Sequence, residues 1–172
     1  MDDGRRRVLA IIGSVIFFFI APMTVAGIVP WWITRWQTAA AFGNVAVLRV
    51  VGVVLILAGV PVLLDSFARF AIQGLGTPAP VFPTRHLVVQ GLYRYVRNPM
   101  YVALLLAVLG QALLFGSLPL LEYGAILWFG FHAFVLAYEE PTMRATFGDQ
   151  YEAFCAHVPR WIPRVRPWDH GS

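Results

Sequence analysis

Four long apolar stretches alternate with more polar segments along the chain. They cover residues 8–29, 45–64, 100–118 and 120–138. Each is close to the roughly 20 residues that a helix needs to cross a bilayer core of about 30 Å. The runs are continuously apolar and lack the alternation of a membrane β-barrel strand. The pattern predicts an all-α membrane protein with four transmembrane helices.

The segments between these stretches differ in length and composition. Gly116 to Pro119 is a short turn, so the third and fourth stretches are expected to form a tight helical hairpin. Residues 73–91, QGLGTPAPVFPTRHLVVQG, are rich in glycine and proline and predict an ordered cytoplasmic loop. We expect a single membrane domain over residues 1–172, with its catalytic part at about 74–166.

A further helix is predicted after the fourth stretch. Four apolar residues recur there at helical spacing: Phe147, Tyr151, Phe154 and Val158. Such a stripe is typical of a short amphipathic helix, which we expect to lie on the membrane surface. Pro159 and Pro163 would end this C-terminal helix.

The charges predict an orientation. All 13 cationic residues are arginine, and most lie before the first stretch, between the second and third, or after the fourth. The other two connections hold only Arg35, with Arg49 just inside the second stretch. The positive-inside rule therefore predicts cytoplasmic N- and C-termini, and we expect the plasma membrane as the location. The net charge of +4 then reflects orientation and contact with membrane lipids, not nucleic-acid binding.

Composition narrows the alternatives further. Hydrophobic residues make up 59% of the chain and charged residues 13%, which leaves too little polar surface for a soluble domain. Arg5 to Arg7 before the first stretch resemble the start of a signal peptide, but the stretch is long and lacks a clear A-x-A-like cleavage site. One cysteine and four histidines without ligand spacing predict no disulfide and no metal site.

Polar side chains gather where the third stretch begins and the fourth ends. Arg94, Arg97 and Asn98 directly precede the third stretch. The free amides of a helix start favour an anionic group such as a carboxylate. Glu139 and Glu140 follow the fourth stretch, and hairpin partners bring these ends together. The combination predicts a pocket for a zwitterionic, amino-acid-like ligand at the membrane boundary.

Each of these features also has a simpler interpretation. The arginines are common topogenic anchors, and the glutamate pair is compatible with a solvated helix end. Three tyrosines form a possible aromatic belt: Tyr93, Tyr95 and Tyr101.

The sequence also resembles a known family. Its motifs are RHLVVQGLYRYVRNPMYVA (residues 85–103) and EEPTMRATFGDQYEAFCAHVPRWIPR (residues 139–164). The first follows the family pattern G-x-Y-x-x-x-R-H-P-x-Y with Asn98 at the histidine position. The second follows E-E-x-x-L-x-x-x-F-G-x-x-Y, with Met143 at the leucine position, and then V-P-R-x-x-P. These motifs are similar to those of the isoprenylcysteine carboxyl methyltransferases and their phospholipid methyltransferase relatives. The resemblance covers roughly the C-terminal half of the chain.

The resemblance implies an S-adenosylmethionine (SAM) site that faces the cytoplasm, with a lipophilic or lipid-linked substrate entering from the bilayer. The implied cofactor-binding residues are Arg85, His86, Leu87, Val88, Tyr93, Asn98, Pro99, Met100, Tyr101 and Glu139. Arg97 and Glu140 are the expected catalytic residues, and Glu140 and His86 are the candidates for a general base. Methyl transfer would be an in-line displacement that depends mainly on alignment and exclusion of water.

Two positions depart from the family pattern. Asn98 replaces the usual histidine, which removes an imidazole acid or base there. Val135 replaces an arginine associated with the substrate carboxylate of the prenylcysteine enzymes, which argues against that substrate. The methyl acceptor and the oligomeric state stay open. Two alternatives also stay open: an NADPH-dependent membrane reductase of the sterol-reductase type, and a non-catalytic membrane protein with a degenerate site.

Overall fold

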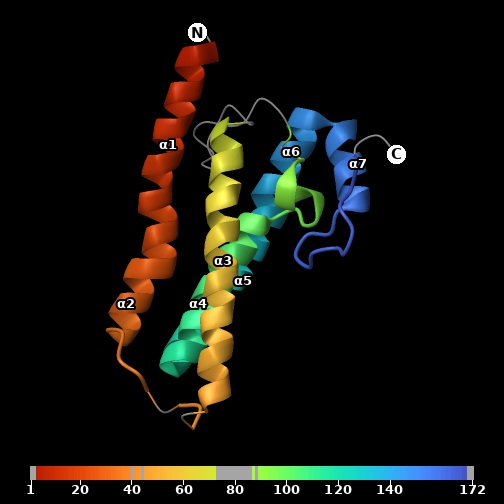
Figure 1. The fold of residues 1–172 in the computed structure, drawn as a ribbon. Helices are drawn as coiled ribbons and strands as arrows, with labels where there is room; N and C mark the ends of the chain where they lie inside the picture. Colours follow the sequence, from red (N-terminus) through yellow and green to blue (C-terminus); the bar gives the residue numbers. More distant parts are fainter. Residues whose placement is uncertain (1–2, 40, 44, 73–86, 88, 170–172) are drawn as a thin grey trace.

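The protein is an elongated bundle of helices that ends in a compact polar region (Figure 1). A computed structural model describes residues 3–39, 41–43, 45–72, 87 and 89–169. These residues contain no strand, which confirms the all-α prediction for the part of the chain described. The first and last described residues both lie toward the upper end of the bundle in Figure 1. The predicted loop lies mostly outside the described residues, including Arg85, His86 and Val88.

The first apolar stretch is a longer helix than predicted. Helix α1 (Asp3–Met23) continues through a π-helical turn, η1 (Thr24–Ile28), into α2 (Val29–Thr34). Pro30 has no N–H, so the carbonyl of Ala26 loses its α-helical donor. The side chain of Gln111 donates to this carbonyl at 2.8 Å, and the Tyr123 hydroxyl donates to the neighbouring Val25 carbonyl at 3.1 Å. Neighbouring helices thus satisfy the backbone that proline disturbs.

Helix α3 (Ala46–Ile72) packs along α4 (Pro99–Phe115) through small residues. A Cβ on Gly52 would lie 2.5 Å from the Gly110 carbonyl oxygen, and one on Gly110 would lie 2.6 Å from the Gly52 oxygen. Seven residues along α3, a Cβ on Gly59 would lie 2.8 Å from the oxygen of Ala103. Small residues let two apolar helices approach closely, which substitutes for the hydrophobic driving force that lipid does not provide.

Helix α4 and helix α5 (Leu118–Phe134) form the predicted tight hairpin. Gly116 ends α4 with φ +62°, a left-handed conformation that favours glycine. The Ser117 hydroxyl accepts a hydrogen bond from the Leu120 N–H at 3.3 Å and so caps α5. The predicted third stretch was too long at its end, because the helix stops at Phe115.

The fourth stretch does not end at residue 138 as predicted. Helix α5 continues through a second π-helical turn, η3 (Val135–Glu139), into α6 (Glu140–Phe147). Pro141 lies in the first turn of α6, so η3 and η1 both directly precede a helical proline. A π turn is a known way to accommodate such a disturbance within a continuous helix.

The predicted C-terminal amphipathic helix is α7 (Asp149–His157), but its apolar side faces the protein. Tyr151, Phe154 and Val158 are buried against Trp168, with Leu87 and Val89 packed beside them. The chain itself covers this stripe, which corrects the expectation that it rests on the membrane. Periodicity indicated which side chains share a face, but the segment that covers them is remote in sequence.

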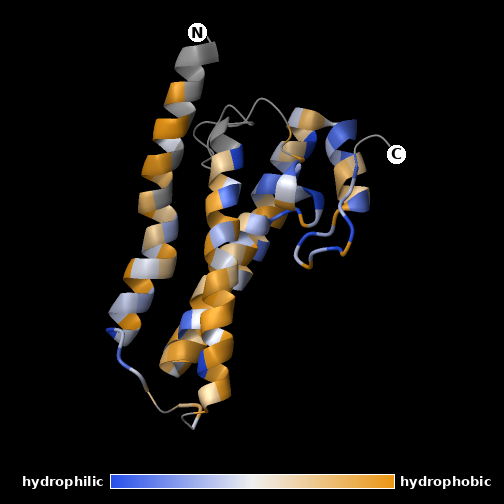
Figure 2. Ribbon diagram, in the orientation of Figure 1, coloured by the Kyte–Doolittle hydropathy of each residue, from blue (hydrophilic) through white to orange (hydrophobic). Residues whose placement is uncertain are grey.

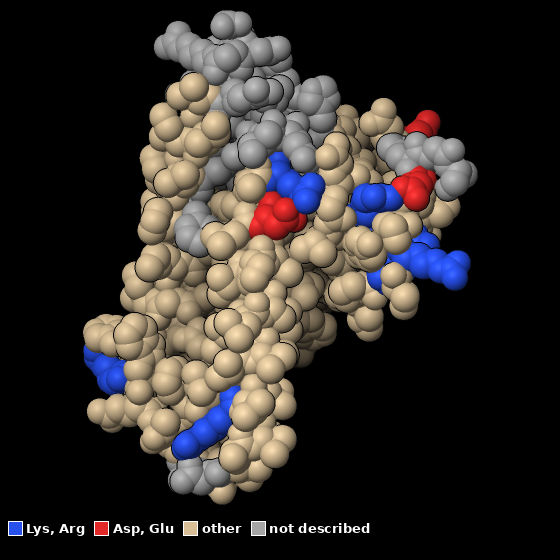
Figure 3. Space-filling model, viewed as in Figure 1, with Lys and Arg blue, Asp and Glu red and all other residues tan. Residues whose placement is uncertain are grey.

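Among the described residues, three helices are long and apolar enough to cross a membrane, so the predicted count of four stays a prediction: Ile11–Thr34, Ala46–Arg69 and Leu118–Phe147. Helix α4 is also apolar but has 17 residues, or about 26 Å at 1.5 Å per residue. Hydrophobic residues dominate the helices in Figure 2, and hydrophilic ones concentrate around α6 and α7. On the face in Figure 3, acidic side chains appear only toward the upper end. The molecule is therefore an integral membrane protein. We call the end at α6 and α7 the charged end, because acidic and basic side chains gather there, whereas Arg35, Arg49 and Glu122 lie toward the opposite end.

Candidate functional site at the charged end of the bundle

The site is built around the start of α4. The chain reaches it through a 3₁₀ turn, η2 (Gly91–Arg94), where Gly91 has φ +56° and lies against the Arg69 guanidinium of α3. A side chain at this position would meet both the backbone strain and that guanidinium. Pro99 then begins α4 and is fully buried. This geometry directs Tyr93, Arg97 and Asn98 toward the ends of neighbouring helices.

Tyr93 and Tyr101 form one side of the site together with Glu139. The Tyr101 hydroxyl donates to Glu139 Oε1 at 2.9 Å, and the Tyr101 ring stacks on Phe131 with centroids 4.6 Å apart. Tyr93 is 6% exposed, and its hydroxyl is hydrogen-bonded to Ser66 of α3. Burial raises the pKa of Tyr93 far above its ordinary value, and the nearby Glu139 carboxylate raises it further. Tyr93 is therefore a neutral hydroxyl beside an acidic group.

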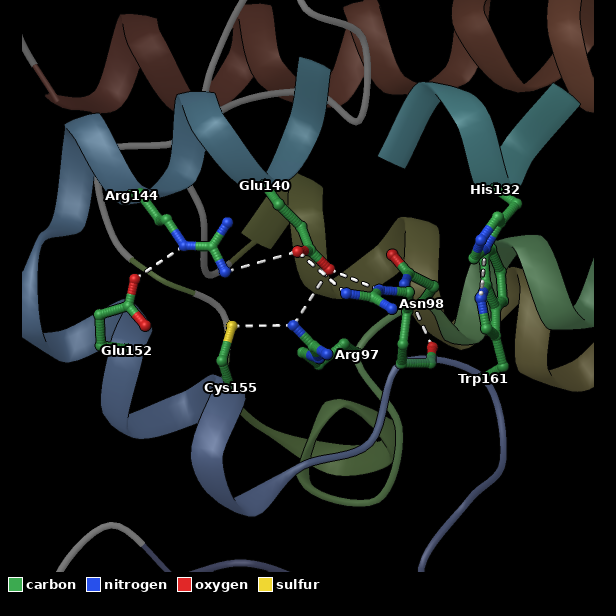
Figure 4. A network of polar contacts seen from close by, with 9 residues as sticks. Arg97, Asn98, His132, Glu140, Arg144, Glu152, Cys155 and Trp161 are labelled. Carbon is green, nitrogen blue, oxygen red and sulfur yellow. Dashed lines mark hydrogen bonds and ion pairs between the residues drawn. The ribbon is translucent and has the colours of Figure 1, made fainter. Parts of the chain in front are cut away.

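Glu140 lies in a different environment, among three arginines (Figure 4). Arg160 binds it in a bidentate manner, with Nε 2.6 Å from Oε1 and Nη2 3.1 Å from Oε2. Arg97 Nη1 is 3.1 Å from Oε1, and Arg144 Nη2 is 3.6 Å from Oε2. The Glu140 side chain is 4% exposed, so these partners replace its water. The bond to Glu140 also raises the pKa of Arg160.

Arg97 connects the start of α4 to the C-terminal region. Besides Glu140, its Nη1 donates to Cys155 Sγ at 2.8 Å, and its backbone N–H donates to the Pro159 carbonyl at 2.9 Å. Its side chain is 11% exposed. The Nε atom is buried and has no hydrogen-bond partner in the part of the chain that the structure describes. A buried donor of this kind is costly unless a ligand or water completes it.

Asn98 holds the backbone of the C-terminal segment. Its Nδ2 donates to the Arg160 carbonyl at 3.1 Å, while the Arg160 guanidinium reaches Glu140 (Figure 4). The Arg164 N–H bonds to the Tyr95 carbonyl at 3.0 Å, and the Trp168 N–H bonds to the Arg94 carbonyl at 2.9 Å. Residues 158–168 are therefore attached along residues 94–98.

The structure brings some of the predicted site residues together and directs others into apolar packing. Tyr93, Tyr101 and Glu139 share one cluster, and Arg97, Asn98 and Glu140 share the adjacent one. Leu87 packs against the buried face of α7, and Met100 packs against Leu63, Phe67, Ala103 and Leu104. The predicted cofactor-binding role of Leu87 and Met100 is compatible with these contacts and stays a prediction.

Sequence reasoning assigned no role to several residues of the site. Arg160 lies in the quoted V-P-R-x-x-P motif, so its presence was visible but its bond to Glu140 was not. Asp65, Ser66 and Arg69 lie on the part of α3 beyond the predicted end at residue 64. A helix longer by two turns brings them to Tyr93. The Asp65–Arg69 ion pair, four residues apart, was the signal available for that extension.

The two glutamates make the site electrostatically asymmetric. Three guanidinium groups surround Glu140, whereas the described hydrogen-bonding contact of Glu139 is a tyrosine hydroxyl. A carboxylate beside aromatic rings attracts a cation, and the buried Arg97 Nε attracts an acceptor oxygen. The arrangement suits a ligand that carries both charges.

Comparison with known proteins finds one matching family model and two similar proteins. The family model of phospholipid methyltransferases matches residues 47–150. Protein-S-isoprenylcysteine O-methyltransferase of Schizosaccharomyces pombe is 36% identical over 80 residues, which are 46% of this chain and 34% of that protein. Protein-S-isoprenylcysteine O-methyltransferase B of Arabidopsis thaliana is 31% identical over 80 residues, which are 46% of this chain and 40% of that protein. The match thus spans well under half of either relative. No solved structure matches the chain significantly.

Proposed function

The chain belongs to the phospholipid methyltransferase family, and we propose that it transfers a methyl group from SAM to a lipophilic or lipid-linked substrate. The proposed reaction takes place at the cytoplasmic face, where the charged end of the bundle meets the bilayer. The two isoprenylcysteine O-methyltransferases support a lipophilic acceptor by their similarity. Whether the acceptor atom is oxygen, nitrogen or sulfur is open.

The observation that carries this proposal is the environment of Glu139. Its oxygen accepts from Tyr101 at 2.9 Å, Tyr93 lies beside it, and no cation contacts it among the described residues. An acidic group with two tyrosines near it fits a ligand with an ammonium or sulfonium charge, since aromatic rings attract cations by about 0.5–2 kcal/mol. The Arg97 Nε lies in the adjacent cluster and has no hydrogen-bond partner among the described residues, so it fits the carboxylate of the same ligand.

These residues therefore fit SAM, which supplies an electrophilic methyl group when bound. We propose that Tyr93, Tyr101 and Glu139 hold its cationic part, and that Asn98, Pro99 and Met100 form the adjoining start of α4. The segment Arg85 to Val88 completes the proposed site, as the sequence motif predicts. In this proposal the protein contributes binding, alignment and exclusion of water.

Arg97 and Glu140, the predicted catalytic residues, are best explained as positioning residues. Both Glu140 oxygens already contact guanidinium groups, and Arg97 is held by Glu140 and Cys155. We propose that this pair fixes the start of α4 against the C-terminal segment and aims the free Arg97 Nε. A carboxylate or thiolate acceptor needs no general base at neutral pH, whereas an amine acceptor needs one.

Ligand binding tests the proposal directly. The protein in detergent is titrated with S-adenosylhomocysteine by calorimetry, and radiolabelled SAM is then incubated with the protein and a membrane extract. We expect saturable binding and transfer of label into a lipid-extractable molecule. Binding of NADPH without S-adenosylhomocysteine would identify a reductase instead. Binding of neither would identify a non-catalytic protein.

A further inference from the structure

The segment that follows α7 is an exposed loop with an unusual mixture of side chains. In Figure 2 it carries hydrophilic residues with hydrophobic ones between them. Ile162 is 79% exposed and Val165 is 96% exposed, whereas the cations Arg164 and Arg166 lie next to them in sequence. We call residues 160–167 the C-terminal loop. Two large aliphatic side chains with so little cover are unfavourable in water.

The loop is attached beside an apolar helix rather than projecting into solvent. Trp161 Nε1 donates to His132 Nδ1 of α5 at 3.1 Å (Figure 4). His132 stacks on Trp128 with ring centroids 5.3 Å apart, and both lie within the apolar helix Leu118–Phe147. His132 precedes Glu140 by eight residues, or about 12 Å along a helix. The hydrogen bond therefore holds Trp161 against the apolar part of α5.

The backbone of the loop is suited to a region with little water. Proline has no N–H, and three prolines lie in or beside the loop: Pro159, Pro163 and Pro167. The N–H groups of Arg164 and Trp168 bond to the carbonyls of Tyr95 and Arg94. Fewer free donors lower the energy needed to move this backbone toward the hydrocarbon.

The charges of the loop favour contact with an anionic membrane. Arg164 Nη1 donates to the His157 carbonyl at 2.8 Å, which holds that guanidinium near the end of α7. Arg166 is exposed and has no ion pair among the described residues. Arginines beside aliphatic and indole side chains are typical of a segment that rests in the interface of an anionic membrane.

We propose that the C-terminal loop inserts into the cytoplasmic leaflet, with Ile162 and Val165 at the acyl boundary and Arg166 on the phosphate of an anionic lipid. The loop then forms a wall beside α5, next to the Arg160–Glu140 ion pair. This inference does not depend on methyl transfer. It places a lipid contact where the charged end of the bundle meets the bilayer.

Spin labelling measures the depth of the loop. One cysteine is introduced at Val165 or at Ile162, in Cys155→Ser and, as a second background, Cys155→Ala protein. A matched control label is placed at Gln150, an exposed residue of α7. The labelled full-length chains are placed in nanodiscs of phosphatidylcholine with or without phosphatidylglycerol. Collision rates with oxygen and with a water-soluble nickel chelate are then compared.

We expect a ratio of oxygen to nickel collisions that is severalfold higher at residues 162 and 165 than at residue 150. Phosphatidylglycerol should raise the ratio at residue 165, and Arg166→Gln should abolish this increase. High nickel access at residues 162 and 165 in both lipid mixtures would overturn the proposal. Protection from both reagents would also overturn it, because it would indicate a protein contact, and spin–spin broadening would identify a second copy.

Discussion

Glu139 and Glu140 are neighbours in sequence, yet they lie in opposite electrostatic environments. Glu140 is buried among Arg97, Arg144 and Arg160, which together exceed its charge. Glu139 accepts a hydrogen bond from the neutral Tyr101 and lies beside Tyr93. The difference teaches that an E-E motif is not one functional unit. Guanidinium groups contact both oxygens of Glu140, and we propose that Glu139 is the carboxylate that binds the ligand.

The largest expected effect follows removal of the Glu140 charge. Glu140→Gln leaves three guanidinium groups without the anion that they share. The least exposed of them is that of Arg97, whose side chain is only 11% exposed. We expect the free energy of unfolding to fall by about 3–5 kcal/mol, as for other buried pairs that lose one partner. Denaturant unfolding in mixed micelles, followed by circular dichroism, measures this.

The matched control is Glu152→Gln, which removes the exposed partner of Arg144. That side chain is 57% exposed, and such pairs contribute about 0–1 kcal/mol. If the Glu140→Gln variant and the wild type had the same free energy of unfolding, Glu140 would not have the stabilising role assigned to it.

Glu139→Gln should affect ligand binding and leave the stability of the protein nearly unchanged. The amide oxygen can still accept from Tyr101, so the stability should stay near that of the wild type. The loss of charge should weaken S-adenosylhomocysteine binding by about 10- to 100-fold, or about 1.4–2.8 kcal/mol. Titration calorimetry measures the affinity, with Tyr138→Phe on the exposed side of the same turn as the control. Wild-type affinity in Glu139→Gln would mean that the ligand binds elsewhere.

Tyr101→Phe should also weaken ligand binding, but less than Glu139→Gln does. The ring keeps its stack on Phe131, but the hydroxyl that orients Glu139 is lost. We expect binding to weaken by about 3- to 10-fold, equivalent to about 1 kcal/mol for one hydrogen bond. In the Glu139→Gln background the same change should be non-additive, because the two groups are in contact. Full additivity would show that they act on the ligand separately.

Cys155→Ser should have the smallest effect of the four. Serine keeps an acceptor for Arg97, whose main partner is Glu140. We expect the free energy of unfolding to change by less than about 1 kcal/mol. The unfolding midpoint of the variant measures this, and a drop as large as that of Glu140→Gln would show that the thiol contact supports Arg97 more than the carboxylate does.

Much of the site could be predicted from local patterns. The short turn from Gly116 to Pro119 predicted the α4–α5 hairpin, which is confirmed. The hairpin also predicted that the cationic residues before α4 would lie near the glutamate pair. Arg97 does contact Glu140, whereas Arg94 pairs with Asp169. These features depend on residues close in sequence, where turn chemistry and helix length fix the geometry.

The rest depends on contacts that a single sequence does not reveal. The fourth apolar stretch was expected to end at residue 138, since hydrophobicity stops there, but a π turn carries the helix on to Phe147. Which way each glutamate points depends on that turn. The ion pair joins Glu140, at the start of α6, to Arg160, which lies 20 positions later and beyond the end of α7. No periodicity predicts such a pairing.

The π turn at Val135–Glu139 also has a consequence for how this chain tolerates changes in length. It holds about one more residue than an α-helical turn, and the widened turn absorbs that residue without changing the register of the helices on either side. Loss of one residue within Val135–Glu139 would therefore let the turn close into regular α-helix while α6 kept its orientation. A deletion within the regular helix of α5 or α6 would instead swing everything beyond it by about 100° around the axis, at 3.6 residues per turn. Selection should therefore tolerate the loss of one residue in this turn better than in α5 or α6.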